Sequence, residues 1–107
     1  MNTSGFIRGM MLKNKTTDEF MEVVVRAIRL EFDLDVHLLD IGDAYLITMK
    51  EYKIGLGKQF VDIIKTHYGI DRLILEEFER QGFTFDRNRS QYIQYCFGNY
   101  SGKKQEE

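Results

Sequence analysis

The spacing of the apolar residues changes twice along this chain, and that change most restricts the folds open to it. Between residues 16 and 32 the apolar side chains recur every three or four positions, as on one face of an α-helix. From residue 34 to 56 apolar and polar residues largely alternate, as on strands with one buried face. From residue 57 to 82 the helical period returns. The sequence therefore predicts an α+β fold: an N-terminal helix, a three-stranded antiparallel meander and a helical pair.

The ends of the expected helices are marked by capping residues. Thr16 or Thr17 is expected to cap the first helix, and Asp18 and Glu19 follow in its first turn, where the helix dipole favours negative charge. Gly69 is expected to end the first helix of the pair. Because almost no chain separates the two helices of the pair, we expect them to pack at an angle.

The C-terminal stretch has two interpretations. Residues 83–85 ("FTF") and 91–97 ("QYIQYCF") pair as a hairpin around the polar loop "DRNRS", or a short helix begins near residue 88. Aromatic and β-branched content favours the hairpin, which after a helical pair makes a winged-helix-like arrangement. We expect one globular domain over residues 1–100 and a flexible polar tail over residues 101–107.

Composition narrows the class of protein. The chain has 107 residues, a net charge of −2 and one cysteine. That net charge argues against a general binder of polyanions. A lone Cys96 excludes an intramolecular disulfide and a cysteine-rich zinc site, and its apolar neighbours predict a buried, inert thiol. Neither a signal peptide nor a membrane-spanning segment is predicted, so the cytoplasm is the expected location.

Charge is unevenly distributed, and this is the main indication of a function. Residues 16–49 carry eight acids against two arginines, whereas residues 87–104 carry four basic residues and no acid. Separated charges of this kind steer and orient a protein partner. We therefore expect a small non-catalytic regulatory module of the adaptor or inhibitor type, a profile common among small bacterial and mobile-element proteins, with a homodimer left open. The expected partner-binding residues are Arg87, Arg89, Glu76, Glu77, Glu79 and Tyr100.

A winged-helix-like nucleic-acid-binding protein is the first alternative. Arg87 and Arg89 would then lie at an exposed hairpin tip and contact phosphates. The helix that would enter the groove opposes this function, because its acids outnumber Arg72 and Arg80 and would repel the phosphates.

A small enzyme or metal-binding protein is the second alternative. Asp33, Asp35 and His37 would project from one face of a strand, with ligand types that suit a divalent cation. The solvent face of a half-buried strand explains the same spacing. The "GLGKQF" segment lacks the spacing of a phosphate-binding loop, and neither histidine lies near a serine or cysteine in the sequence. We therefore predict no catalytic residue, no metal and no cofactor.

Overall fold

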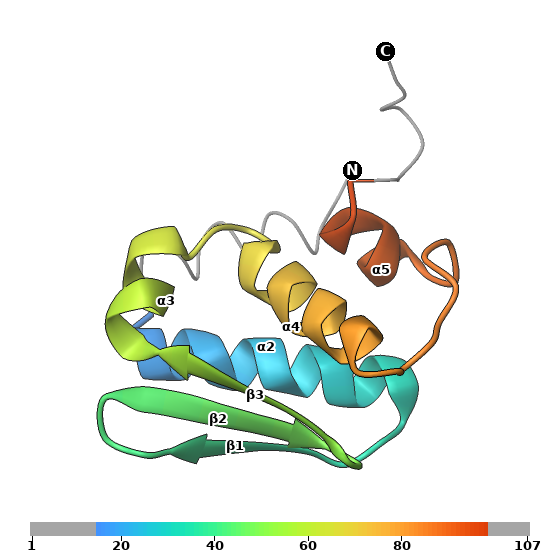
Figure 1. Ribbon diagram of the computed structural model, residues 1–107. Coiled ribbons are helices and arrows are strands. Elements are labelled where there is room, and N and C mark those ends of the chain that lie inside the picture. Colours follow the sequence, from blue (N-terminus) through green and yellow to red (C-terminus); the bar gives the residue numbers. More distant parts are fainter. Residues whose placement is uncertain (1–14, 99–107) are drawn as a thin grey trace.

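A computed structural model describes residues 15–98 of the protein. It shows the predicted α+β order of a helix, a three-stranded antiparallel sheet and further helices (Figure 1). The tail expected over residues 101–107 lies outside the described residues. The elements are α2 (Thr17–Phe32), β1 (Val36–Asp40), β2 (Ala44–Met49), β3 (Tyr52–Gly57), α3 (Lys58–Ile64), α4 (Gly69–Arg80) and α5 (Gln91–Cys96).

Helix α2 begins as its capping residues predict. The Thr16 hydroxyl accepts a hydrogen bond from the Glu19 amide at 3.1 Å, and the Glu19 carboxylate accepts one from the Thr16 amide at 2.9 Å. This reciprocal capping satisfies two amides that the helix leaves without partners. The helix ends at Asp33, which has a left-handed backbone (φ 53°). Its buried face consists of Phe20, Met21, Val24, Val25 and Ile28.

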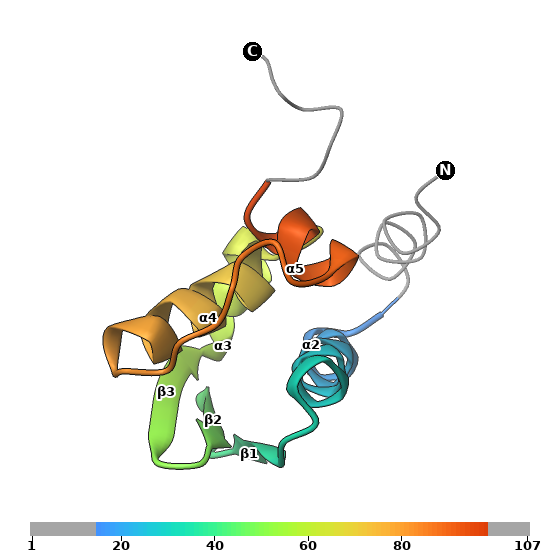
Figure 2. The same cartoon turned by 90° about the vertical axis from the view of Figure 1, so that its right-hand side faces the viewer.

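The sheet has strand order β1-β2-β3 and one covered face. The helices lie on that face, with α2 beside β1 and α4 beside β3 (Figure 2). The register pairs Val36 with Met49 and Met49 with Tyr52, so alternate residues of the three strands point into the core. The alternating pattern of the sequence is thus the pattern of a sheet whose helices, within residues 15–98, lie on one side.

The helical pair differs from expectation at its junction. Helix α3 ends at Ile64, and Gly69 begins α4 instead of ending the preceding helix. A Cβ atom at position 69 would collide with the Thr66 hydroxyl. Glycine avoids this collision at the start of α4, and the prediction that it terminates a helix is wrong.

The C-terminal stretch forms helix α5, so the preference for a hairpin is wrong. Ser90 caps this helix, because its hydroxyl accepts a hydrogen bond from the Ile93 amide at 3.1 Å. The same hydroxyl donates to the Glu31 carboxylate at 2.9 Å, which ties the start of α5 to α2. Ile93 and Cys96 are buried against the core. A cap and a buried helical face outweigh β propensity here, and residues 83–98 supply no wing.

Replacing Ser90 with alanine is expected to lower the free energy of unfolding by about 1 kcal/mol, because the cap of α5 and the link to Glu31 are both lost. Urea denaturation measures the change. Ser90→Thr, which keeps a hydroxyl, is the control and should retain most of the stability. Equal stability of the alanine variant and the unmodified protein would contradict the role of this cap.

Candidate protein-interaction groove

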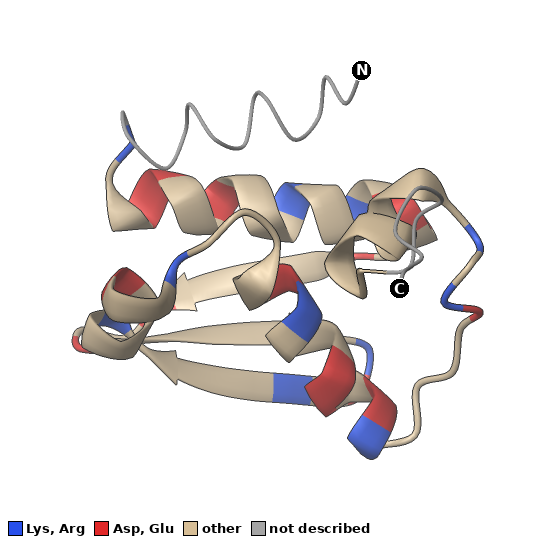
Figure 3. Cartoon of the chain, turned by 90° about the horizontal axis from the view of Figure 1, so that it is seen from above, with Lys and Arg blue, Asp and Glu red and all other residues tan. Residues whose placement is uncertain are grey.

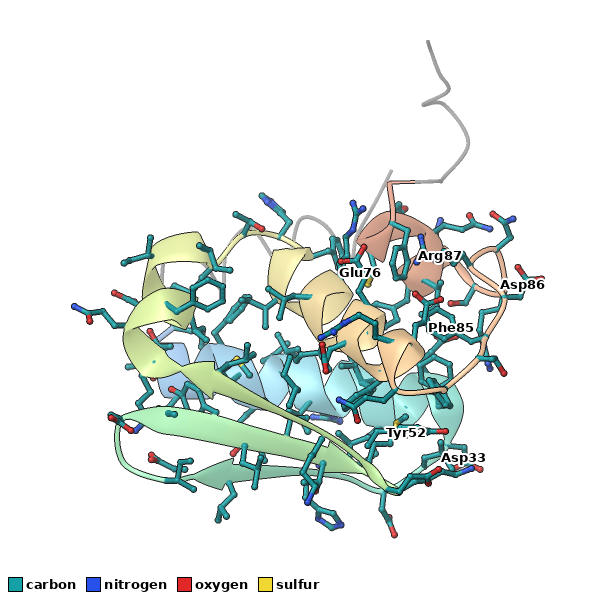
Figure 4. The ribbon with its side chains drawn as sticks, in the orientation of Figure 1. Asp33, Tyr52, Glu76, Phe85, Asp86 and Arg87 are labelled. Atoms are coloured by element: carbon teal, nitrogen blue, oxygen red, sulfur yellow. The ribbon has the colours of Figure 1, made fainter. Side chains whose placement is uncertain are left out.

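A groove of about 630 Å³ lies between strand β3 and helix α4. Ile54 of β3 and Leu73 of α4 supply its apolar surface. Glu76 and Arg87, both labelled in Figure 4, belong to its charged lining. The complete charged lining is Glu76, Glu77, Glu79, Arg80 and Arg87. The structure therefore brings four of the six residues expected from the sequence around one groove.

The carboxylates of the groove are already paired within the protein. Acidic and basic residues follow one another along α4 (Figure 3). Arg72 lies 3.0 Å from Glu76 on the same helix. Two further ion pairs join Arg80 to Glu77 and Arg87 to Glu79. Because each glutamate has its own guanidinium, α4 is not the strongly acidic surface that its sequence suggests.

Hydrogen bonds shift the pKa values of two residues of the groove, Glu77 and Arg87. Those from Gln81, and then from Arg80, hold the pKa of the Glu77 carboxyl below its usual value. The hydrogen bond to Glu79 raises the pKa of Arg87. Both shifts favour the charged form, of Glu77 as a carboxylate and of Arg87 as a guanidinium.

Asp71 also differs from its expected place. In the sequence it is one of the acids of α4, the helix that would enter a DNA groove in the winged-helix-like alternative. In the structure its side chain is fully buried. It accepts a hydrogen bond from the Tyr92 hydroxyl at 2.5 Å, which joins α4 to α5. This carboxylate belongs to the core and does not face a ligand on the surface.

Arg87 and Arg89 do not lie at a hairpin tip. The Arg87 guanidinium lies 4.1 Å from the centre of the Phe97 ring and 2.6 Å from Glu79. Arg89 lies 2.8 Å from Glu31, over the Phe32 ring. Their side chains are 45% and 40% exposed, so both reach solvent while holding the connecting segment against α4 and α2. Tyr100 lies outside the described residues.

Gln81, like Ile54 and Leu73 of the groove, was not expected from the sequence to belong to the site. Its side-chain oxygen accepts a hydrogen bond from the Lys53 amide at 3.1 Å, and its nitrogen donates to the Lys53 carbonyl at 2.7 Å. The carboxamide thus pairs with both main-chain groups of one residue on the outer edge of β3. Since 28 positions separate the two residues, no local spacing in the sequence signals the contact.

The acids and the histidine proposed as metal ligands do not share one strand. β1 begins at Val36, so only His37 belongs to it, while Asp33 ends helix α2 in a left-handed conformation. The expected alignment on one strand face is therefore wrong. Within residues 15–98 no three His, Cys, Asp or Glu side chains are grouped so that they could hold a metal ion.

Cys96 is buried, as its apolar neighbours predict, with 4% of its surface exposed. We expect a thiol reagent to label the native protein slowly and the denatured protein rapidly, because the reagent reaches the sulfur only when the core opens. Labelling followed by mass spectrometry, with and without urea, measures both rates. Rapid labelling of the native state would refute the structural role of this thiol.

Comparisons with protein-family models, with curated proteins and with solved structures find no match to this chain. None of the helices within residues 15–98 has both the length and the apolar character needed to cross a bilayer. The groove is therefore the feature from which a function can be inferred.

Proposed function

We propose that this protein is a small non-catalytic binding module that recognises a segment of another protein in the groove between β3 and α4. The observation that supports this most directly is the composition of the groove. An apolar patch at Ile54 and Leu73 is bordered by ionised side chains. Protein interfaces have the same arrangement, with an apolar centre that excludes water and a polar rim.

The paired charges contribute orientation rather than simple attraction. Glu76 is 44% exposed and retains access to solvent beside Arg72. Charged side chains of a partner can replace one member of such a surface ion pair at a small cost in free energy, because exposed ion pairs contribute only about 0–1 kcal/mol each. Contact with Leu73 and Ile54 then supplies affinity, while the charges select the register of the bound segment.

Affinity capture with a matched pair of variants tests this function. Leu73→Gln places a polar group in the groove, and Ile63→Gln makes the same exchange on α3, where the side chain is 76% exposed. In extract of the source organism, we expect a protein partner to be retained by the unmodified chain and by Ile63→Gln. We expect the Leu73 variant to lose it, with an unchanged circular dichroism spectrum. Equal retention by both variants would overturn the proposed groove.

Duplex DNA is expected to bind only weakly. Residues 83–98 form no wing, Asp71 faces the core, and the two arginines near α5 are paired with glutamates. Fluorescence anisotropy with mixed-sequence duplexes in about 150 mM salt should give a Kd no tighter than about 10⁻⁶ M, the strong end of ordinary non-specific binding. Nanomolar binding of duplex DNA would instead favour the alternative function, a winged-helix-like nucleic-acid-binding protein, over protein recognition.

A further inference from the structure

We infer that the groove holds its partner as an added β-strand on the outer edge of β3, paired with the main chain of Gly55, and that the Gln81 carboxamide occupies part of this edge until the partner binds. The inference rests on the proposed function and specifies its binding mode. Strand addition uses main-chain hydrogen bonds for affinity and alternate side chains for specificity.

The hydrogen-bond pattern of the sheet shows which residues of β3 face outward. In an antiparallel pair, successive residues direct their main-chain groups alternately toward the neighbouring strand and away from it. Both main-chain groups of Lys53 bond to Gln81, so Lys53 faces away from β2. Gly55, two residues later, therefore faces away as well. The bond from the Lys58 amide to the Asp43 carbonyl, at 2.9 Å, agrees with this alternation.

The Gln81 side chain imitates a peptide group. A carboxamide has the same N–H donor and C=O acceptor as the main chain, and here both are used on one residue of the edge. These hydrogen bonds lie at an exposed position, where water competes with them. An incoming strand can therefore replace the Gln81 carboxamide at Lys53 and gain a second pair of bonds at Gly55.

Gly55 is an exposed position of β3. A Cβ atom built there would meet only the Tyr45 carbonyl within 4 Å, at 3.9 Å. Its missing side chain lies on the uncovered face of the sheet, the face to which Lys53 points. Because β3, like β1, is an edge strand of the described sheet, an extended segment can pair with its outer edge.

Charge on the two sides of this edge describes the occupant. On the groove side, three carboxylates face two guanidiniums around Ile54 and Leu73. On the opposite side, the exposed Lys53 points to the uncovered face of the sheet. Successive side chains of a strand alternate between these sides. The structure thus fits an extended segment of a partner protein with apolar residues and charges of both signs on one side and an acidic residue on the other.

Two substitutions at position 55 separate strand addition from other binding modes. Gly55→Pro removes the outward N–H and leaves the bonds between β2 and β3, which do not use it. Gly55→Ala retains the N–H and adds only the Cβ atom that proline also has, so it controls for the loss of glycine. The probe is a set of twelve-residue peptides selected from a displayed random library for binding to the unmodified protein. Only the peptides that fail to bind the Leu73→Gln variant are used.

Because Gly55→Pro loses the outward hydrogen bond, its affinity for these peptides is expected to be about tenfold weaker than that of the unmodified protein. The affinity of Gly55→Ala is expected to stay within about twofold. Gln81→Ala, which frees the edge, is expected to bind them at least as tightly as the unmodified protein. Thermal unfolding verifies that each variant folds. In the unmodified protein, amide hydrogen exchange at Gly55 should slow when peptide is added, a readout that does not depend on the proline variant.

Several outcomes overturn the strand mode. The groove binds a helix or a loop if amide exchange at Gly55 is unchanged with saturating peptide, or if the proline and alanine variants bind the peptides with equal affinity. In that case, partner capture that depends on Leu73 would still support the proposed function. A selection that yields no peptide sensitive to Leu73→Gln also rejects strand addition. Sedimentation tests whether the occupant is a second copy of this protein. A concentration-dependent dimer that the Gly55→Pro variant does not form would identify a second copy, and not a separate partner protein, as the occupant.

Discussion

Replacing Phe78 with alanine is expected to lower the free energy of unfolding by about 3–5 kcal/mol, the usual cost of removing a fully buried aromatic ring. Phe78 has no exposed surface and lies in α4 with its ring centre 6.0 Å from that of Tyr52. It therefore joins the helix of the groove to the first residue of β3. Its removal leaves a cavity between the two elements that form the candidate site. Urea denaturation followed by circular dichroism measures the change.

Ile63→Ala is the matched control for this experiment. It also removes a large apolar side chain from a helix, but that side chain is 76% exposed. We expect a change within about 0.5 kcal/mol, as for most surface substitutions. If Phe78→Ala costs no more than Ile63→Ala, α4 does not pack on β3 as described.

Reversing both arginines, Arg87→Glu with Arg89→Glu, is expected to lower the free energy of unfolding by about 2–3 kcal/mol, because two ion pairs and two cation–π contacts are lost and replaced by repulsion. A carboxylate at position 87 would face Glu79, and one at position 89 would face Glu31, whose side chain is only 10% exposed. Exposure alone would suggest a harmless change. The contacts predict a costly one, which thermal and urea unfolding measure.

Arg87→Gln with Arg89→Gln is the control, because it removes the attraction without adding repulsion. The reversal should cost more than this pair at low salt, and the difference should shrink at 1 M salt, where screening extends over only about 3 Å. A double reversal that leaves stability unchanged would mean that Arg87 and Arg89 do not hold the connecting segment.

The first half of the fold was predictable because its signals are local. The capping pair Thr16 and Glu19 lies within one turn of helix, and the alternation across β1, β2 and β3 reflects neighbouring positions on each strand. These features depend on residues a few positions apart, whose spacing is set by backbone geometry. The sequence therefore predicted the helix, the meander and the α+β class.

The second half depended on contacts that propensity does not encode. α5 forms because Ser90 caps it and binds Glu31, a residue 59 positions earlier in the chain. Gly69 is explained by the nearby Thr66 side chain rather than by the end of a helix. In both cases the intrinsic preference of the segment was weaker than the packing of the folded chain.

The candidate site shows the same division. The charged residues of α4 and of the segment after it are visible in the sequence, which identified Glu76, Glu77, Glu79 and Arg87 as candidates. The pairing of these charges, the position of Ile54 and Leu73 among them and the contact of Gln81 with the edge of β3 became visible in the folded chain. The physical reason is distance along the chain: periodicity specifies which face of an element a residue lies on, whereas ion pairs and edge contacts depend on which elements the folded core brings together.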